Sequence, residues 1–420
     1  MFKTLANAWK IPEIRQKILF TLLMLLIYRI GAFIPVPGVN VDFIAQQVEN
    51  YDILGFLNLF SGGSLANLTI FALGIIPYIN ASIIMQLLTI AIPKLERMSK
   101  EGDDGRRKIA SITRYLGVIL GLVQSIGIMA GLGSGAVEPG ATWFTYVTIV
   151  ACLTAGTALI MWIGERITEK GIGNGISLLI FIGIVSSLPN TVFQLFNRMI
   201  IGDLNFWLVV LTIGLAFLIV LGITFVDLGE RRIPVQYAKR VVGRKMYGGQ
   251  STHIPMKVNQ GGVMPLIFAV TIIQFPSMIA QFFPESGFTA WYATYAAAGT
   301  PLYIIVYALL ILFFSYFYST IAFNPVDVSK NLQQNGGFIP GIRPGKPTSD
   351  YLSKILSRIT FFGAVFLAIV AALPTMFNTM TGVMNAFGAT SILIMVNVAL
   401  ETTKQLEAQM MMRHYKGFLN

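Results

Sequence analysis

Long apolar runs, not the short alternations of a soluble protein, dominate the pattern of hydrophobic and polar positions in this chain. The runs recur along the whole length and contain about 20 residues each, which is the length that a helix needs to cross a bilayer. We therefore predict ten transmembrane helices. They lie at about 18–33, 74–92, 115–132, 143–164, 176–195, 206–225, 263–283, 302–323, 359–375 and 379–400.

Composition agrees with this prediction and narrows the classes of function. Hydrophobic residues make up 55% of the 420 residues and charged residues 12%, about half of the roughly 25% found in soluble domains. The net charge of +11 must then lie in a few loops, where it meets anionic lipid or acidic partners and not free DNA. The single Cys152 excludes an internal disulfide, and two histidines with one thiol exclude a Cys/His metal cluster. We expect neither a metal nor another cofactor.

The positions of the basic residues test the helix count. With both termini in the cytoplasm, 28 of the 30 lysines and arginines fall in cytoplasmic segments, while Arg198 falls outside and Arg29 lies within the first helix. Basic residues concentrate in cytoplasmic loops, and one helix more or fewer would invert every later loop. We therefore predict ten helices with both termini cytoplasmic. Arg29 is costly if it faces lipid, so it either extends toward the interface or pairs with protein.

One apolar stretch is too long for one helix, and its flanking charges disagree with two. No charged residue occurs between Asp52 and Lys94, and two crossings would place a loop without Lys or Arg in the cytoplasm. We predict instead a short segment at about 60–70 that enters the protein without crossing, which favours a channel or a transporter. A helix lying on the outer surface is the alternative. The residues that supply a flexible entry, a helix cap and polar groups needing partners are Ser61, Gly62, Gly63, Ser64, Asn67 and Thr69.

Patterns that could indicate nucleotide binding or catalysis are not supported. The string GIGNGIS at 171–177 has glycines spaced like a phosphate loop, but it opens a membrane helix after a charged turn. A tight turn that lets two helices pack closely is the better interpretation. The predicted helices contain no pair of acids for a proton relay or a protease, and no Ser/His or Cys/His pair for a nucleophile. We expect no enzymatic activity.

Polar side chains within helices and two long loops are the remaining candidates. Glutamines and hydroxyls in the helices serve interhelical hydrogen bonds or line an interface that must open. The loops 227–262 and 324–357 are too long for simple connections and carry many basic residues. They either set the topology or form a docking surface for a large soluble partner. The hydrophobic Tyr237, Phe338 and Ile339 within them favour docking.

Six strings of the sequence resemble the SecY family of protein-conducting channels of the bacterial plasma membrane. They are FSGGSLANLTIFALGIIPYINASIIMQLL, EGDDGRRKIASITRY, ITEKGIGNGIS, YAKRVVGRKMYGGQSTHIPMKVN, NPVDVSKNLQQNGGFIPGIRPG and GATSILI. They run from the first helix to the last, so the resemblance covers essentially the whole chain. It implies an all-α polytopic membrane protein, with ten transmembrane helices in two inverted five-helix halves, 1–200 and 201–420, and a re-entrant plug helix.

The resemblance also implies a function and the residues that perform it. The function is that of a passive channel that secretes unfolded polypeptides and releases transmembrane segments sideways into lipid. The pore ring corresponds to Ile75, Ile79, Ile176, Ile180, Ile267 and Ile394. The plug corresponds to Phe60, Ser61, Gly62, Gly63, Ser64, Leu65, Asn67, Leu68 and Ile70, and the lateral gate to Gln86, Gln124 and Thr271. The residues that dock a motor or ribosome correspond to Lys239, Arg240, Arg244, Lys245, Arg343 and Lys346.

The implied partners follow from the same resemblance. They are the SecE and SecG subunits, substrate preproteins with their signal peptides, and the SecA ATPase or the ribosome, one of which supplies the energy. The alternative function is a secondary transporter for a small solute, because inverted repeats and broken helices also mark that class. Such a transporter needs charge or paired polar groups at the membrane midplane, and the predicted helices offer only Arg29, near an edge.

Overall fold

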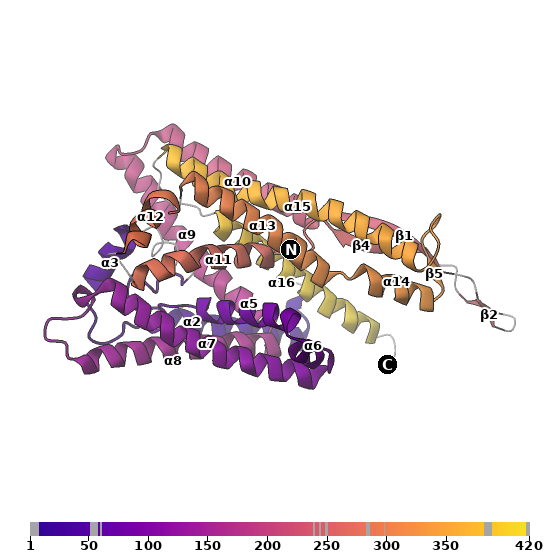
Figure 1. Ribbon diagram of the computed structural model, residues 1–420, viewed down its shortest axis with the longest axis horizontal. Helices are drawn as coiled ribbons and strands as arrows, with labels where there is room; N and C mark the ends of the chain where they lie inside the picture. Colours follow the sequence, from indigo (N-terminus) through magenta and orange to yellow (C-terminus); the bar gives the residue numbers. More distant parts are fainter. Residues whose placement is uncertain are drawn as a thin grey trace. The chain divides into compact units, whose positions relative to one another are not determined.

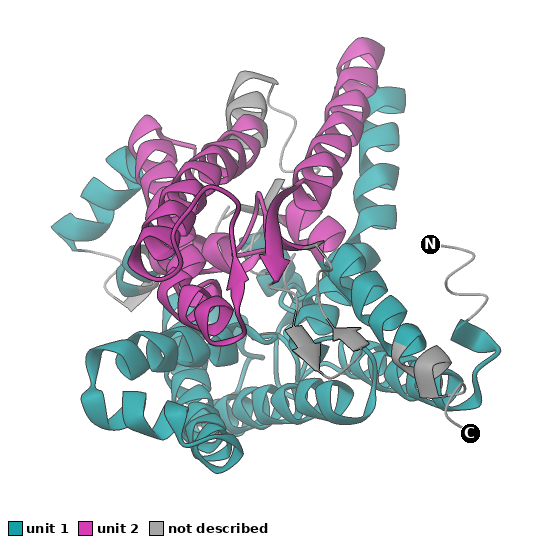
Figure 2. Cartoon of the chain, turned by 90° about the vertical axis from the view of Figure 1, so that its right-hand side faces the viewer, with its two compact units in different colours: residues 1–203, 274–298, 398–420 teal, residues 204–273, 299–397 magenta. Residues whose placement is uncertain are grey.

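The computed structural model describes residues 8–50, 58, 61–237, 240–242, 245–247, 251–282, 286–297, 299–381 and 389–416. Figure 1 labels its helices and strands, and helices make up most of the described chain. Two compact units are distinguished in Figure 2. Unit 1 comprises Met1–Asp203, Gln274–Ala298 and Val398–Asn420, and unit 2 comprises Leu204–Ile273 and Gly299–Asn397. The predicted halves are defined by a different criterion, the inverted repeat, and stay a prediction.

Unit 1 is built around a group of long helices that pack on their sequence neighbours. Helix α5 packs on α7, α7 on α8 and α8 on α9, while α2 lies against both α8 and α9. Local signals set several helix ends: proline occupies the first turn of α2 and of α5, and Asn174 caps α9. The helices are α2 Pro12–Gly31, α3 Val41–Asn50, α5 Ile76–Ala91, α6 Pro93–Lys100, α7 Asp103–Leu132, α8 Trp143–Lys170, α9 Gly175–Ile201 and α12 Gly287–Tyr295, with a short 3-10 turn η1 at Ser134–Ala136.

Unit 2 has its own helix packing. Helix α13 runs along α15, α14 contacts α15, and α10 contacts α15 as well. Within the α13–α15 interface the hydroxyls of Ser319 and Thr360 lie 2.7 Å apart and form a hydrogen bond, the use predicted for polar groups inside membrane helices. The helices are α10 Phe206–Leu228, α13 Pro301–Ala322, α14 Pro325–Gln334 and α15 Lys346–Thr381, together with parts of α11 Met264–Phe282 and α16 Ala389–Lys416, each of which is divided between the two units.

Six helical stretches of the described chain are long and apolar enough to cross a membrane. They are α7, α8, α9, α10, α13 continued by α14, and the first 28 residues of α15. A seventh is the pair α5 and α6, which is bent by 101° at Ile92. Charged residues lower the apolar length of α2, α11 passes only as a shorter apolar helix, and the predicted helix at 379–400 falls partly outside the described residues. The chain is therefore a multi-pass membrane protein, and the count of ten stays a prediction.

Two small sheets in unit 2 add strands to a fold for which the resemblance implied helices alone. Strands β1 Glu230–Tyr237, β4 Ser251–Lys257 and β5 Gly337–Phe338 form an antiparallel sheet in the order β4-β1-β5. Strands β2 Arg240–Val242 and β3 Lys245–Tyr247 form a separate hairpin. The fold is thus mostly but not wholly helical. The exception arises because the two long loops satisfy their backbone groups by forming strands. The sequence carried a signal, because Ile233 and Val235 alternate with Arg232, Pro234 and Gln236, which is the period of a half-buried strand. Both apolar residues are buried in the structure.

Candidate functional site

A buried segment of unit 1, residues 61–75, lies between α3 and α5 and is called the turn segment below. It consists of consecutive turns and not of a regular helix. Gly62 and Gly63 have φ values of 68° and 88°, and Leu68 has a φ of 34°, outside the right-handed helical region. The predicted plug helix therefore takes the form of turns where the structure describes it, and Phe60 lies outside the described residues.

The apolar side chains of the turn segment belong to the core of unit 1. Leu65 is 1% exposed and Leu68 is fully buried, and both belong to one cluster with Ile149 and Leu153 of α8. Lipid-facing residues on a free outer helix would not be covered in this way. The burial therefore agrees with the prediction of a segment that enters the protein and disagrees with a helix lying on the outer surface.

Backbone hydrogen bonds tie the turn segment to the chain that follows α2. The amide of Val36 donates to the carbonyl of Leu68, and the amide of Ile70 donates to the carbonyl of Ile34, both at 3.1 Å. These bonds flank an antiparallel bridge between Pro35 and Thr69. In that arrangement the two bridged residues are a non-hydrogen-bonded pair, whose Cα atoms lie about 4.5 Å apart.

Two side chains of α2 hold the entry of the turn segment. The hydroxyl of Tyr28 donates to the carbonyl of Ser61 at 3.4 Å, and Nη1 of Arg29 donates to the carbonyl of Gly62 at 3.0 Å. The Tyr28 ring also stacks on Phe71, and the Arg29 guanidinium lies 5.1 Å from the ring centre of Phe33. Of the two alternatives for Arg29, the structure shows pairing with protein.

Close packing around the turn segment depends on glycine. A Cβ atom at Gly156 of α8 would overlap the carbonyl oxygen of Ile70, and one at Gly62 would lie 2.9 Å from Cα of Gly183 in α9. Any larger residue at these positions would displace the backbone, because backbone atoms do not yield as flexible side chains do. Helices α8 and α9 therefore provide a seat shaped for the backbone of this segment.

The polar groups of the turn segment are satisfied unequally. Ser61 Oγ accepts a hydrogen bond from the amide of Leu65 within the turns, and Thr69 Oγ1 accepts one from the amide of Phe71. Asn67 is exposed. Ser64 Oγ is buried and has no hydrogen-bond partner within the described chain. Such a group costs about 1–3 kcal/mol, so the buried arrangement carries a built-in penalty.

The predicted pore isoleucines are divided between the two units. In unit 1, Ile75 precedes α5 and Ile79 lies one turn later, while Ile176 and Ile180 lie one turn apart on α9. Ile75 and Ile180 are buried, and Ile79 and Ile176 are half-buried. In unit 2, Ile267 of α11 is half-buried and Ile394 of α16 is buried. That all six converge on one ring stays a prediction.

The predicted gate residues lie on three helices. Gln86 is on α5, where its amide donates to the hydroxyl of Ser82 at 3.4 Å, and Gln124 is on α7. Helices α5 and α7 pack against each other. Thr271 is buried on α11 in unit 2. Their joint role as a gate stays a prediction.

The two predicted docking loops join into one platform in unit 2. Strand β5 of the second loop pairs with β1 of the first, Gln236 with Phe338 and Tyr237 with Gly337. Beneath the sheet lies a separate apolar core contributed by the strands, α14 and α15. Its buried members are Ile233, Val235, Met256, Leu332, Ile339, Leu352, Ile355 and Leu356. We call strands β1, β4 and β5 with α14 and this core the loop platform.

Arg343 projects from a segment that the platform holds in place. Its carbonyl accepts a hydrogen bond from Thr348 Oγ1 at 2.8 Å, and the carbonyl of Gly345 accepts one from Ser329 Oγ at 2.7 Å. The side chain of Arg343 is exposed and forms no ion pair with any described residue. A fixed backbone with an exposed, unpaired guanidinium is what a docking residue requires.

The other predicted docking residues are less fully described. Lys346 is exposed at the start of α15. Arg240 and Lys245 lie on the β2–β3 hairpin, where Arg240 pairs with Tyr247 and Lys245 with Val242. Lys239 and Arg244 lie outside the described residues.

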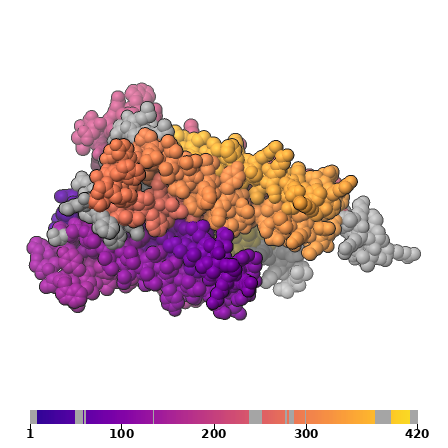
Figure 3. Space-filling model, in the orientation of Figure 1, coloured from indigo at the N-terminus to yellow at the C-terminus, as the bar shows by residue number. Residues whose placement is uncertain are grey.

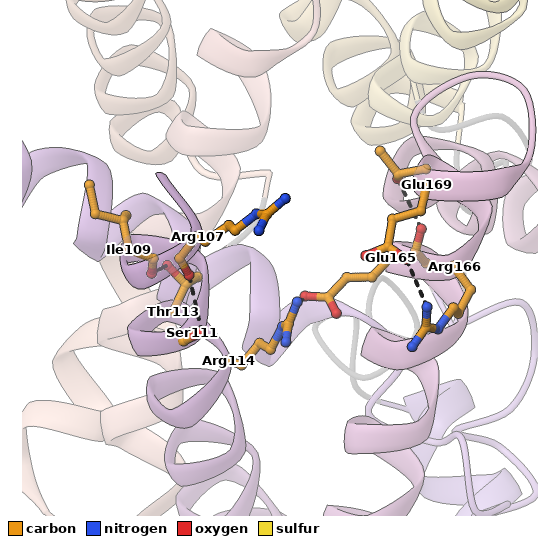
Figure 4. A network of polar contacts seen from close by, with 10 residues as sticks. Arg107, Ile109, Ser111, Thr113, Arg114, Glu165, Arg166 and Glu169 are labelled. Atoms are coloured by element: carbon orange, nitrogen blue, oxygen red, sulfur yellow. Dashed lines mark hydrogen bonds and ion pairs between the residues drawn. The ribbon is translucent and has the colours of Figure 1, made fainter. Parts of the chain in front are cut away.

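The predicted tight turn of GIGNGIS is confirmed at the end of α8. A Cβ at Gly175 would overlap the carbonyl oxygen of Gly164, so glycine lets α8 and α9 approach closely. The amide of Ile172 donates to Thr21 Oγ1 of α2 at 3.1 Å. Figure 4 shows the nearby charged end of α8, where Glu165 pairs with Arg114 of α7 at 2.5 Å and Arg166 pairs with Glu169 at 2.8 Å.

A polar cluster in unit 2 was not predicted from the sequence. Nδ2 of Asn259 donates to Oδ1 of Asp227 at 2.9 Å, and the amide of Asn397, with its nitrogen toward the carboxylate, donates to the same oxygen at 3.1 Å. Both asparagines are buried. The cluster links the end of α10 to α16 and to the segment before α11. The sequence signal for this cluster was Asp227, a single acid at the end of the otherwise uncharged helix α10.

Comparisons with known proteins agree with this geometry. A family model described as SecY matches residues 69–403. The chain is 47% identical over 444 residues to the protein translocase subunit SecY of Streptomyces scabiei and 44% identical over 431 residues to that of Bacillus subtilis (strain 168), with 100% of both chains covered in each case. A solved structure described as "The structure of a protein conducting channel" matches with a TM-score of 0.69 at 20% identity. Sec61 in the canine ribosome-channel complex from the endoplasmic reticulum matches with a TM-score of 0.65 at 17% identity, and both matches cover 96% of each chain.

Proposed function

The chain belongs to the SecY family, and on that premise we propose how its described parts close and open a protein-conducting pore. It is the central pore-forming subunit of a Sec translocon, a passive channel that lets unfolded polypeptides cross the membrane and releases transmembrane segments sideways into lipid. It transports polypeptides and belongs to a family of translocation channels, not to a class of enzymes. Secondary transport of a small solute has no support among its relatives.

The turn segment is the plug of this channel, and its burial is the observation that carries the proposal. It is apolar, it lies in the core of unit 1, and one isolated bridge with two α2 side chains holds its backbone. A segment with few regular backbone bonds opens locally at a lower free energy than a sheet or helix. The unpartnered hydroxyl of Ser64 lowers the cost of opening further.

The predicted isoleucines form the waist that remains when the plug leaves. A narrow hydrophobic constriction excludes ions by dewetting, while aliphatic side chains yield to a passing polypeptide. We expect Ile394→Asn or Ile267→Asn to wet this waist and to raise ion conductance in planar bilayers. We infer that Gln86 of α5, Gln124 of α7 and Thr271 of α11 belong to the lateral gate. An inserting apolar segment shifts the closed–open balance of this gate by its affinity for the open state.

The loop platform is the docking surface for the machine that supplies energy. Hydrogen bonds to the carbonyls of Arg343 and Gly345 fix the backbone here. The exposed Arg343 side chain therefore suits bidentate bonds with a partner carboxylate or phosphate. A ribosome-bound relative of the same fold supports a large soluble partner here. We propose that SecA or the ribosome binds this platform, that SecE- and SecG-like subunits complete the channel, and that it lies in the bacterial plasma membrane with both termini in the cytoplasm.

A disulfide across the isolated bridge tests the plug. Pro35 and Thr69 are a non-hydrogen-bonded antiparallel pair. The Cα separation of about 4.5 Å in such a pair suits a disulfide. In a Cys152→Ser background, we expect the double variant Pro35→Cys/Thr69→Cys to stop translocating a reporter into vesicles when oxidised. Reduction should restore translocation, because only the release of the plug has been prevented.

Two controls separate plug release from damage. The single variants Pro35→Cys and Thr69→Cys should translocate equally well with oxidant and with reductant. Mass spectrometry of the oxidised double variant establishes that the disulfide has formed. Normal translocation by the fully cross-linked protein would show that residues 61–70 need not move, and the plug assignment would then be wrong.

A further inference from the structure

Helix α12, Gly287–Tyr295, presents a stripe of aromatic side chains. The stripe contains Phe288, Trp291, Tyr292 and Tyr295, four aromatic residues at helical spacing in a helix of nine. Their rings are successive neighbours, with centroids 6.2 to 6.4 Å apart. The atoms of α12, orange-red in Figure 3, lie on the visible surface.

The two edges of this stripe have different environments. Tyr292 is 7% exposed, so its ring packs against protein. The rings of Phe288, Trp291 and Tyr295 are 41%, 50% and 59% exposed. On the other side of the helix, Ala290 is also exposed, and Thr289 Oγ1 donates to the carbonyl of Ala280 near the end of α11. The helix is therefore held on α11 with a large aromatic surface outward.

The position of α12 in the chain places it near a membrane boundary. Helix α13 begins at Pro301 and contributes to a stretch that is long and apolar enough to cross a bilayer. Six residues of chain advance separate Tyr295 from Pro301, and an extended chain covers at most about 20 Å over that distance. Helix α12 thus cannot lie far from the level at which α13 enters the bilayer.

The charge of this region agrees with a lipid surface. No charged residue occurs between Glu285 and Asp327, so α12 has no ionic group that must stay in bulk water. Exposed aromatic patches mark interaction sites, and Trp and Tyr concentrate at the membrane–water interface, where the ring is apolar and one end is polar. A soluble partner would be expected to meet some charge at the rim of its interface, and α12 offers none.

We propose that α12 is an interfacial helix whose Phe288, Trp291 and Tyr295 insert among lipid headgroups. The partner is the bilayer itself, on the side opposite the basic loops. This binding surface goes beyond the channel function and does not depend on it. Its effect is to keep the end of α11 at a constant depth, through the contact of Thr289 with Ala280.

Tryptophan quenching tests the proposal on the full chain in vesicles. The variant Trp9→Phe/Trp143→Phe/Trp162→Phe/Trp207→Phe retains Trp291 alone. In phosphatidylcholine/phosphatidylglycerol vesicles with brominated acyl chains, we expect Trp291 emission to fall about twofold relative to unbrominated vesicles, as for an interfacial ring. Aqueous acrylamide should quench it only weakly. In the same background, Trp291→Phe with Tyr295→Trp probes a second residue of the exposed edge and should give the same result.

A matched control lies on the same helix. The variant Trp291→Phe with Ala290→Trp, in the same background, places the probe away from the aromatic edge. We expect acrylamide, and not bromine, to quench this probe. Trp291 and Tyr295→Trp quenched by acrylamide and insensitive to bromine would place the stripe in water and overturn the proposal. Insensitivity of both probes to both quenchers would also overturn it, because protein and not lipid would then cover the stripe.

Discussion

The turn segment of unit 1 and the loop platform of unit 2 each have an apolar core, but their backbones are held differently. One isolated bridge, Pro35 with Thr69, joins the turn segment to its neighbour. Strands β1 and β4 of the platform pair continuously from Glu230 with Lys257 to Gln236 with Ser251. Because a continuous ladder opens cooperatively and a single bridge opens alone, the turn segment is suited to move and the platform to stay rigid.

The two regions also differ in charge, and this difference agrees with a moving turn segment and a rigid platform. The turn segment contains no charged residue, and the charged Arg29 of α2 donates a hydrogen bond to its Gly62 carbonyl. The platform and its turns carry exposed arginines, among them Arg231, Arg232 and Arg343. An uncharged segment carries no ion with it when it moves, whereas a rigid platform can present charges in a fixed geometry. The predictions below test this division between a moving and a fixed region.

The largest effect is expected at the fixed region. We predict that Arg343→Glu abolishes motor- or ribosome-driven translocation, because the new carboxylate would repel the partner carboxylate or phosphate that the guanidinium binds. Arg343→Lys should only weaken translocation, since lysine keeps the charge but cannot copy the planar fork. Translocation of a reporter into vesicles measures the effect. Both variants should insert and assemble normally, and a loss of assembly would instead make Arg343 a structural residue.

A smaller effect is expected where Arg29 holds the moving region. The variant Arg29→Met removes a charge-assisted hydrogen bond to the carbonyl of Gly62, worth about 1.5–3 kcal/mol. We expect ion conductance in planar bilayers to rise about tenfold or more, and amide exchange over 64–72 to accelerate while β1 is unchanged. Arg29→Lys is the matched control and should lie between wild type and Arg29→Met. Equal acceleration of exchange in β1 would mean general destabilisation and not release of the plug.

The opposite sign is expected for Ser64. The variant Ser64→Ala removes a buried hydroxyl that has no partner within the described chain, and relief of that penalty is worth about 1 kcal/mol or somewhat more. We expect slower amide exchange in the turn segment and lower basal conductance, with full translocation retained at saturating substrate. Ser61→Ala is the contrasting variant, because Ser61 Oγ accepts a hydrogen bond from Leu65. Acceleration of exchange by Ser64→Ala would contradict the closed arrangement.

The smallest effect is expected at an exposed pair on α6. Lys100 donates a hydrogen bond to Glu96 and lowers the pKa of that carboxyl. A lowered pKa in the folded state means that the pair contributes above the ordinary pKa of glutamate and is lost as the pH falls through the lowered value. We expect Lys100→Met to return the Glu96 pKa toward its ordinary value without a measurable change in translocation. NMR titration of Glu96 in the two proteins is the measurement.

Local patterns were sufficient for several features of the candidate site. Helix length and apolarity predicted the membrane class, and the gap in charge between Asp52 and Lys94 predicted a segment that enters the protein. The glycines of GIGNGIS predicted the close contact of α8 and α9. These features depend on residues near one another in the chain, so their spacing is informative.

Features that depend on distant residues were decided only by the tertiary structure. The sequence left two fates open for Arg29, and only the folding of residue 62 back onto α2 identified its partner. The pairing of β1 with β5 joins residues about 100 positions apart, and the turns at 61–75 replace the expected helix because α8 and α9 shape their seat. Apolarity and spacing predict that a segment leaves water for lipid or for the protein interior. Which atoms it then meets depends on contacts between remote parts of the chain, and no local pattern specifies those.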